Sequence, residues 1–247
     1  DNDKVVNYIW DGTFEGDHNS KITWAHLLQQ NSDWSGELWG GKDWADRPPS
    51  EGGLDEWKFR KLNEPGTVME YNDVRVNVLA YALTHVWRKP LPLVLKEKIM
   101  DKIGASTTWR WHGYEEAWTE IDGFKMKSVT GGGHSGGGIF ISTEDMARFG
   151  LLFLNDGVWQ DTQLLSKEWI IKAMTPSTPN INYGYLWWLN KKGPRHWDGL
   201  SENIFYAAGF GGNFIVIDKE NDLVVVTRWL EPSNIEAFMQ KVNKALN

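Results

Sequence analysis

The sequence predicts an α+β fold, in which a mostly helical region over residues 1–175 precedes antiparallel strands and a closing helix over residues 176–247. In the first region the apolar residues recur every three or four positions, which is the period of a helix. In the second region the apolar runs are short and rich in β-branched and aromatic residues, as in strands. Helices and strands are thus segregated along the chain, which favours an antiparallel sheet over a doubly wound parallel one.

Capping residues, apolar periodicity, and proline or glycine at helix ends predict the helices in the first half of the chain. Residues 22–30 are expected to form a short helix with Thr23 as its N-cap. Residues 31–66 are rich in Gly, Pro, Asp and Ser and are expected to be mostly loop. In residues 73–87 apolar residues recur at every fourth position, which indicates an amphipathic helix. A proline opens and a glycine closes the helix expected over residues 92–104.

Two further helices precede the strands. Residues 142–157 open with Ser142 and Asp145 in the spacing of a capping box. Residues 166–174 are expected to form a short helix that Pro176 ends. The strands predicted after them are residues 183–190, 204–209, 213–218 and 223–229. A hairpin turn, "KEND", joins the last two strands, and an amphipathic helix over residues 234–246 closes the chain.

Composition excludes several classes of function. The chain has 247 residues, no cysteine and a formal net charge of −7, which argues against nonspecific binding to nucleic acid and rules out disulfide or thiolate chemistry. No apolar run is long enough to span a membrane, and the first residues lack the features of a signal peptide. The six histidines are scattered without the spacing of metal ligands, so neither a metal nor a cofactor is expected. The 16 tryptophans indicate core packing or, alternatively, an aromatic-walled cleft for a sugar or acyl group.

Residues 131–138 read "GGGHSGGG" and contain the Gly-x-Ser-x-Gly pattern of a serine nucleophile elbow around Ser135. The elbow requires a helix directly after the serine, whereas three glycines and an apolar, strand-like run follow Ser135. No lysine follows the glycines, as a phosphate-binding loop would require. The favoured interpretation is that the glycines permit positive φ angles and close backbone approach. His134 is then a wall of a cleft or a structural histidine, and an α/β-hydrolase that uses Ser135 is the alternative.

Taken in order, a set of segments resembles the β-lactamase-related serine hydrolases, which include class C β-lactamases, penicillin-binding proteins and esterases. The segments are "ITWAHLLQQNSDW", "PGTVMEYNDVRVNVLAYAL", "IGASTTWRW", "GGGHSGGGIFISTEDMARFGLLFLNDG", "YGYLWW" and "AAGFGGNFIVIDKENDLVVV". The resemblance covers nearly the whole chain and implies a β-lactamase/transpeptidase-like fold. It also implies acyl transfer without a cofactor on a small-molecule ester, amide or peptide, and it slightly favours a periplasmic or secreted location.

In that family a Tyr-x-Asn motif supplies a tyrosine that relays protons. The stretch "YND" at residues 71–73 matches it, which implies that Tyr71 is this tyrosine and that Asp73 stands in place of the asparagine. The added charge of Asp73 would favour a protonated lysine in the site. Alternatively, Asp73 simply caps the helix that begins there.

A second family motif is a Lys- or His-led triplet that ends in glycine and precedes an oxyanion-binding N–H. The stretch "AAG" at residues 207–209 falls at this position, so Ala207 replaces the cation and the backbone N–H of Phe210 would donate to the oxyanion. Loss of the cation removes the usual anchor for a β-lactam or peptide carboxylate. The resemblance therefore favours an esterase, amidase or small-peptide hydrolase. The residues predicted to line the substrate site are His134, Ser135, Ala207 and Gly209.

The third family motif, Ser-x-x-Lys, supplies the nucleophile and the lysine that activates it. No serine of this sequence has a lysine three positions later. In the family the motif lies upstream of the segment that matches the first residues here. The N-terminal part of the fold is therefore expected to be missing, and a complementary segment carrying Ser-x-x-Lys is a candidate partner. Two interpretations follow: a serine hydrolase in which Tyr71 and the Phe210 N–H face one hollow, or a catalytically silent relative that binds a ligand in a Trp-lined cleft.

Overall fold

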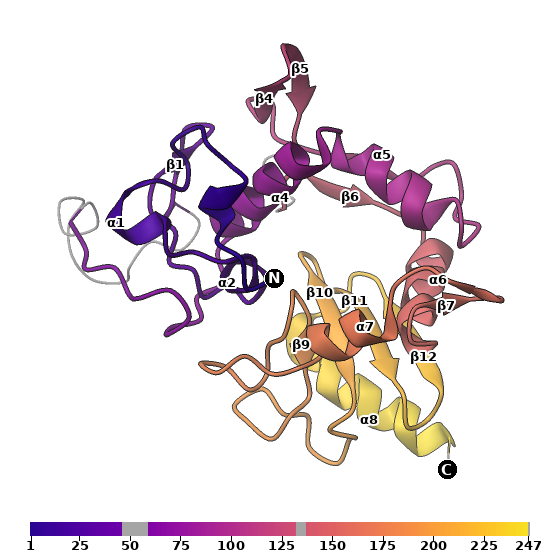
Figure 1. Cartoon of the computed structure of the whole chain (residues 1–247). Coiled ribbons are helices and arrows are strands. Elements are labelled where there is room, and N and C mark those ends of the chain that lie inside the picture. Colours follow the sequence, from indigo (N-terminus) through magenta and orange to yellow (C-terminus); the bar gives the residue numbers. More distant parts are fainter. Residues whose placement is uncertain (46–58, 132–136, 247) are drawn as a thin grey trace. The chain divides into compact units, whose positions relative to one another are not determined.

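The computed structural model describes residues 1–45, 59–131 and 137–246 (Figure 1). Contacts divide the chain into two compact units. Unit 1 comprises Asp1–Leu95 and Arg110–Ile139, and unit 2 comprises Lys96–Trp109 and Phe140–Asn247. The division predicted at residue 175 separates a helical from a strand-rich part of the chain, whereas these two units are defined by contacts between residues. The predicted division therefore stays a prediction.

Helix α4, Asp73–Trp87, provides a large part of the core of unit 1. The other elements of this part of the chain are η1 Val5–Asn7, α1 Gly16–Asn19, α2 Trp24–Leu28, β1 Glu37–Leu38, β2 Gly41–Lys42, α5 Leu91–Leu95, β3 Arg110–His112, β4 Trp118–Ile121, β5 Phe124–Lys127 and β6 Gly138–Phe140. Val74, Val78 and Ala82 of α4 are buried in one cluster with Trp34. This confirms the helix predicted over residues 73–87. Val86, the last of the predicted apolar row, is 46% exposed, so the buried face of α4 ends before the helix does.

The starts of α2 and α4 are fixed by side-chain caps. Thr23 caps α2 as predicted: its Oγ1 accepts from the His26 N–H at 3.3 Å, and His26 Nδ1 accepts from the Thr23 N–H at 3.2 Å. The N-cap of α4 is Asn72, whose Oδ1 accepts from the Val74 N–H at 2.9 Å. The interpretation of Asp73 as the cap is therefore wrong, because Asp73 is the first helical residue. Its negative charge at the amino end of α4 interacts favourably with the helix dipole.

Unit 1 also holds a hairpin that the apolar periodicity does not predict. Strands β4 and β5 pair antiparallel, with Ile121 opposite Phe124. The two turn residues between them, Asp122 and Gly123, have φ angles of +58° and +76°. Positive φ at both central residues is what the tight hairpin turns require, and Asp-Gly is a preferred pair for them. This pair between β-prone residues is the signal that could have predicted the hairpin.

The helix expected over residues 92–104 is present but changes type along its length. Helix α5 begins at Leu91, one residue before Pro92, and ends at Leu95. The chain continues as a π-helical segment, Lys96–Met100. Gly104 has a φ of +67°, which a glycine adopts without strain and which lets the chain leave the helical direction, as predicted.

Unit 2 contains a four-stranded antiparallel sheet in the order β12-β11-β10-β9, which confirms the predicted α+β class (Figure 1). Its strands and helices are α6 Thr143–Leu154, β7 Val158–Trp159, β8 Thr162–Gln163, α7 Lys167–Ala173, β9 Trp188–Leu189, β10 Phe205–Gly209, β11 Asn213–Asp218, β12 Leu223–Thr227, η4 Pro232–Asn234 and α8 Ile235–Leu246. Asp218 pairs with Leu223, which confirms the hairpin turn at 219–222. Within the described ranges, no helix is long and apolar enough to cross a membrane.

The strand expected over residues 183–190 is reduced to the two residues of β9. Tyr183 forms an isolated bridge with Trp188, and the Gly184 N–H donates to the Trp187 carbonyl at 2.9 Å. Leu186 between them has a φ of +59°. The chain therefore turns back on itself before it enters the sheet, and its aromatic side chains are buried in this turn rather than along an extended strand.

Helices cover both faces of the sheet. Successive side chains of β11 point to opposite faces, so their contacts show which helix lies on each face. Phe214 and Val216 pack in one cluster with α8. On the other face, Gly150 of α6 lies so close that a Cβ there would be 2.9 Å from Ile215 and 2.6 Å from Val224. The prediction of an antiparallel sheet flanked by helices is thus confirmed. The accessible parts of such a sheet are its edges and strand ends.

The tryptophans divide between the core and the surface. Trp34, Trp187 and Trp197 are buried, as the core-packing interpretation expects. Trp10 and Trp229 are 79% and 75% exposed. Trp197 stacks on Tyr206 with the ring centroids 4.3 Å apart, which makes it part of the packing of α8 on the sheet.

Candidate active site

Tyr71 is half-buried, and both of its neighbours in the chain are fixed by hydrogen bonds. The Glu70 N–H donates to the Gln30 carbonyl at 2.8 Å. The Asn72 N–H donates to Gln30 Oε1 at 3.5 Å, and the Asn72 side chain caps α4. The backbone of Tyr71 is thus held from both sides at the amino end of a buried helix. This placement restricts where its phenol can reach.

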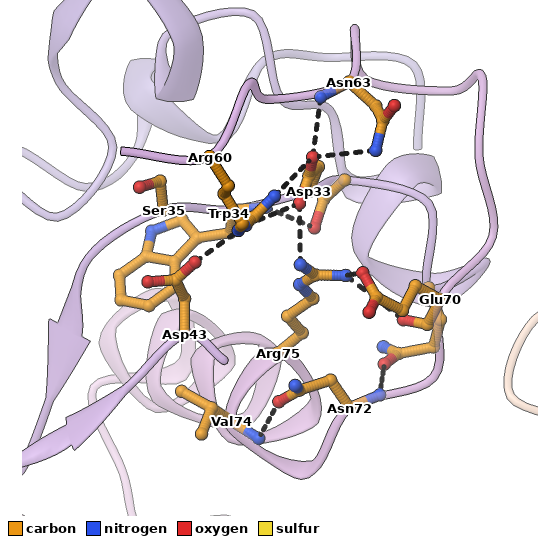
Figure 2. Close-up of polar contacts among 12 residues, drawn as sticks. Asp33, Trp34, Ser35, Asp43, Arg60, Asn63, Glu70, Asn72, Val74 and Arg75 are labelled. Carbon is orange, nitrogen blue, oxygen red and sulfur yellow. Dashed lines mark hydrogen bonds and ion pairs between the residues drawn. The ribbon is translucent and has the colours of Figure 1, made fainter. Parts of the chain in front are cut away.

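A buried ion-pair network adjoins this segment (Figure 2). The Asp33 side chain, 2% exposed, accepts from Arg75 Nη2 at 2.6 Å and from Arg60 Nη1 at 3.1 Å. The backbone N–H and the Nδ2 of Asn63 donate to the same carboxylate at 2.7 and 3.1 Å. Arg60 Nη2 also lies 2.8 Å from Asp43 Oδ2. Asp33 is therefore surrounded by donors, which is the condition under which a buried carboxylate is tolerated.

Arg75 joins this network to the neighbour of Tyr71. Its Nη1 donates to Glu70 Oε2 at 2.8 Å and to the Glu70 carbonyl at 3.3 Å. Arg75 is itself 2% exposed on the buried side of α4. The local sequence does not identify this network. The only signal is an arginine within an apolar helical row, which is costly to bury unless it is paired.

The network shifts the ionisation of Asp33. Burial by itself would raise the pKa of the Asp33 carboxyl. The hydrogen bonds from Arg60 and from the Asn63 N–H, together with the charges of Arg75 and Arg60, outweigh burial and hold the pKa below its ordinary value of 3.8. The Asp33 carboxylate is consequently ionised throughout the neutral range.

We expect the contribution of Asp33 to stability to be lost in acid. Because its pKa is lower in the folded than in the unfolded state, the contribution is fully present above about pH 5 and declines as the pH falls through 3.8 toward the folded value. Urea unfolding of the wild type and of Asp33→Asn between pH 7 and pH 3 measures it. The difference in unfolding free energy between the two proteins should shrink as the pH falls. A difference in unfolding free energy that does not depend on pH would contradict the lowered pKa of Asp33. The other aspartates titrate in both proteins, so their contribution cancels in this difference.

Gly131 lies near both Asp73 and Gly137 in unit 1. The Gly131 N–H donates to Asn77 Oδ1 of α4 at 2.8 Å, and a Cβ on Gly131 would lie 4.0 Å from Asp73 Oδ1. A Cβ on Gly137 would lie 2.0 Å from Thr130 Oγ1 and 3.0 Å from the Gly131 carbonyl oxygen. The predicted close backbone approach is thus confirmed at Gly137. The predicted site residues His134 and Ser135 lie outside the described residues.

In unit 2 the predicted triplet forms the last three residues of β10. The final pair between β9 and β10 is Trp188 with Tyr206. The Asn190 N–H donates to the Ile204 carbonyl at 2.9 Å, so the backbone groups of Ile204 and of alternate residues after it point toward β9. Ala208 is in this alternation, and no residue of β9 lies opposite it. The backbone of Ala208 therefore faces an edge that β9 leaves uncovered.

The N–H of Phe210 points to the same uncovered edge. Ala207 and Gly209 alternate with the residues that face β9, so their carbonyl groups face β11, where they lie opposite Ile215 and Asn213. The peptide bond that follows Gly209 is trans, and its N–H is directed opposite to its carbonyl. The Phe210 N–H is thus directed away from β11. Its role as an oxyanion donor stays a prediction.

The turn after Phe210 is held by polar side chains. Asn213 Nδ2 donates to the Phe210 carbonyl at 2.6 Å, and Arg228 Nε donates to Asn213 Oδ1 at 2.9 Å. Arg228 Nη1 continues to the Ile141 carbonyl at 2.7 Å. At Gly212, φ is +72° and a Cβ would lie 1.6 Å from the Leu230 carbonyl oxygen. The turn therefore requires glycine at this position.

The structure places Tyr71 and Asp73 in unit 1, where Asp73 lies near Gly131. It brings Ala207, Gly209 and Phe210 together in unit 2. The catalytic and substrate-binding roles of these residues stay predictions. In the part of the chain that is described, no group of three or more His, Asp or Glu side chains is placed to hold a metal ion.

Comparison with known proteins identifies the family. The family model named Beta-lactamase matches residues 2–229. The chain belongs to the Beta-lactamase family. This confirms the resemblance of the ordered segments and places the chain outside the α/β-hydrolase fold that the Ser135 alternative requires.

Two curated relatives of this Beta-lactamase family chain share one hydrolase name. A protein of Escherichia coli O157:H7 named "Putative D-alanyl-D-alanine carboxypeptidase" is 25% identical over 210 residues, which cover 72% of this chain and 48% of the relative. The chain thus spans about half the length of the curated relatives it matches.

Two solved structures show the same fold. A "putative beta-lactamase" from Bacteroides dorei DSM 17855 has a TM-score of 0.67 and 16% identity, and the match covers 100% of this chain and 78% of that one. A family VIII carboxylesterase has a TM-score of 0.62 and 15% identity, and the match covers 98% of this chain and 76% of that one. At these identities the likeness is evidence of the fold, and the β-lactamase/transpeptidase-like fold is confirmed.

Proposed function

We propose that this chain is part of a serine hydrolase that transfers the acyl group of an ester, amide or small peptide to water. The family and the names of the relatives support hydrolysis. The observation that carries the proposal is the end of β10, where the Phe210 N–H is directed to an uncovered edge and its turn is held by Asn213. A fixed N–H at an accessible strand end is suited to stabilise an oxyanion.

The nucleophile in this proposal is the serine of a Ser-x-x-Lys segment that is not among residues 1–247. Tyr71 accepts the proton of the serine hydroxyl as it passes its own phenolic proton to the neutral lysine, and the serine oxygen attacks the carbonyl carbon. The oxyanion accepts from the N–H of the serine and from the N–H of Phe210. The leaving group departs with a proton, and water, activated through Tyr71, then releases the acyl group and regenerates the serine.

Asp73 and Ala207 adjust this chemistry. The negative charge of Asp73 would stabilise the protonated form of a nearby lysine and so raise the affinity of that lysine for the proton it receives. Ala207 offers no cation, which favours ester, amide and small-peptide substrates over β-lactams. A second candidate is a catalytically silent relative that binds a ligand. It is favoured by Ala207 in place of the family's cation and by the lack of a Ser-x-x-Lys motif in residues 1–247.

Labelling with a fluorophosphonate probe tests the proposal in the protein joined to its Ser-x-x-Lys segment. We expect one labelled serine, located in that segment, and unchanged labelling in Ser135→Ala. Absence of labelling together with tight ligand binding would establish the silent relative instead. Loss of labelling in Ser135→Ala alone would make Ser135 the nucleophile.

A further inference from the structure

A cavity of about 560 Å³ lies in unit 2, between helix α7 and the strands β9 and β10. Phe205, the first residue of β10, is part of its wall, whereas Gly209 of the triplet is the last residue of the same strand. The two residues are about 13 Å apart along the strand. Tyr206 packs with α8, so the side chain of Phe205 lies on the other face of the sheet. The cavity is therefore separate from the candidate active site.

Apolar side chains form most of the cavity wall. The most buried of them are at most 2% exposed: Ile170 of α7, Leu189 of β9, and Ile204 and Phe205 where β10 begins. Ile171, the next residue of α7, also lines the cavity and is 58% exposed, so it belongs to the rim. The volume is within the range of small-molecule sites, and the wall suits a ligand with an apolar body.

The half-buried side chain of Lys191 brings a positive charge to this wall. Nδ2 of the buried Asn182 donates to the Lys191 carbonyl at 2.6 Å and to the Leu189 carbonyl at 3.0 Å, which fixes the backbone of this segment. Among the described residues, the Lys191 ammonium forms no ion pair. Its charge is therefore available to a ligand in the cavity.

Two other charged residues of the lining already have partners in the protein. The Lys219 ammonium donates to the Asp156 carboxylate. Glu202 Oε1 lies 3.2 Å from the ammonium of Lys192, which is outside the lining. These pairs neutralise each other's charge, so they offer less to a charged ligand than Lys191 does.

Glu220, the remaining charged residue of the lining, is exposed in the turn after β11, so solvent and salt screen its charge more than that of Lys191. An apolar wall with one unpaired cation matches a ligand that has an apolar body and a negative end. We propose that this cavity binds an aliphatic carboxylate of medium chain length, with the chain between α7 and β9 and the carboxylate on Lys191. This binding goes beyond the proposed function, because it takes place away from the triplet and requires no catalytic serine.

Calorimetric titration of the chain with octanoate, with the neutral octanamide and with the cationic octylammonium tests the site. We expect octanoate to bind, and the other two probes to bind at least about tenfold more weakly, because they cannot form the charge-assisted hydrogen bond. Lys191→Met, which keeps a long apolar side chain, should weaken octanoate binding to the same extent and leave octanamide binding unchanged. Lys241→Ala, which removes an exposed charge from α8 on the other face of the sheet, is the control and should bind octanoate as the wild type does.

The methyl signals of Ile171 and Met174, which both line the cavity, locate the bound ligand and should shift when octanoate is added. Ile171→Ser should weaken octanoate and octanamide alike, because it removes apolar contact and leaves Lys191 in place. Absence of octanoate binding, equal binding of the three probes, or unchanged octanoate binding in Lys191→Met would overturn the proposal. Tighter binding of octylammonium would also overturn it, because Glu220 would then be the charge that the ligand contacts.

Discussion

Replacing Arg75 with alanine is expected to lower the free energy of unfolding by about 3 kcal/mol. The Arg75 side chain is 2% exposed and is bonded to Asp33 and to Glu70. Its removal leaves the equally buried Asp33 carboxylate with Arg60 as its remaining cation. This places the loss at the lower end of the range for broken buried ion pairs, because Asp33 keeps part of its compensation. Urea unfolding at pH 7, followed by tryptophan fluorescence, measures the change.

Arg88→Ala is the matched control, because Arg88 is the C-cap of the same helix. Arg88 pairs with Asp122, and the two side chains are 65% and 39% exposed, so its loss should cost less than about 1 kcal/mol. Arg75→Lys should fall between the two alanine variants, because an ammonium cannot bind two carboxylates with the planar fork of a guanidinium. Equal unfolding free energies for Arg75→Ala and Arg88→Ala would show that the buried network contributes no more than a surface pair.

The elements that could be predicted are those in which local signals and tertiary packing agree. The helix over 73–87 has an apolar row and a polar cap, and both are used in the structure. The strands of the β11–β12 hairpin are continuous β-branched runs joined by a short polar turn. The segment 183–190 does not form the extended strand that was predicted. Its aromatic residues can be buried in a turn as well as in a strand, and in the structure Tyr183 bridges to Trp188 across a turn. Composition alone does not separate these two outcomes.

The candidate site could be predicted only where a motif is contiguous. Tyr71 and the triplet at 207–209 are short stretches whose position in an ordered set of segments identifies them. The network is different, because Asp33 binds Arg60 and Arg75, which lie 27 and 42 residues away. Contacts of this kind come from tertiary structure, and no local pattern of residue types determines them.

In the protein joined to its Ser-x-x-Lys segment, Tyr71→Phe is expected to lower kcat/KM for a chromogenic ester by about 10²- to 10⁴-fold. The substitution removes the hydroxyl that relays the proton and keeps the ring. The hydrogen bonds that Glu70 and Asn72 make to Gln30 and Arg75 do not involve the Tyr71 side chain, so they remain in the variant. Stopped-flow acylation, together with urea unfolding of the same variant, separates a catalytic loss from a structural one.

Tyr81→Phe is the matched control for this experiment. The Tyr81 hydroxyl donates to Asp11, and burial, followed by the bond to Asp11, raises its pKa to about 12. A phenol that holds its proton so firmly cannot relay one near neutral pH, so this variant should lose about 1 kcal/mol of stability and keep its kcat/KM. Unchanged acylation in Tyr71→Phe would remove Tyr71 from the reaction. The attachment of this segment to the buried network would then serve the stability of unit 1, and the proton relay would have to come from another residue.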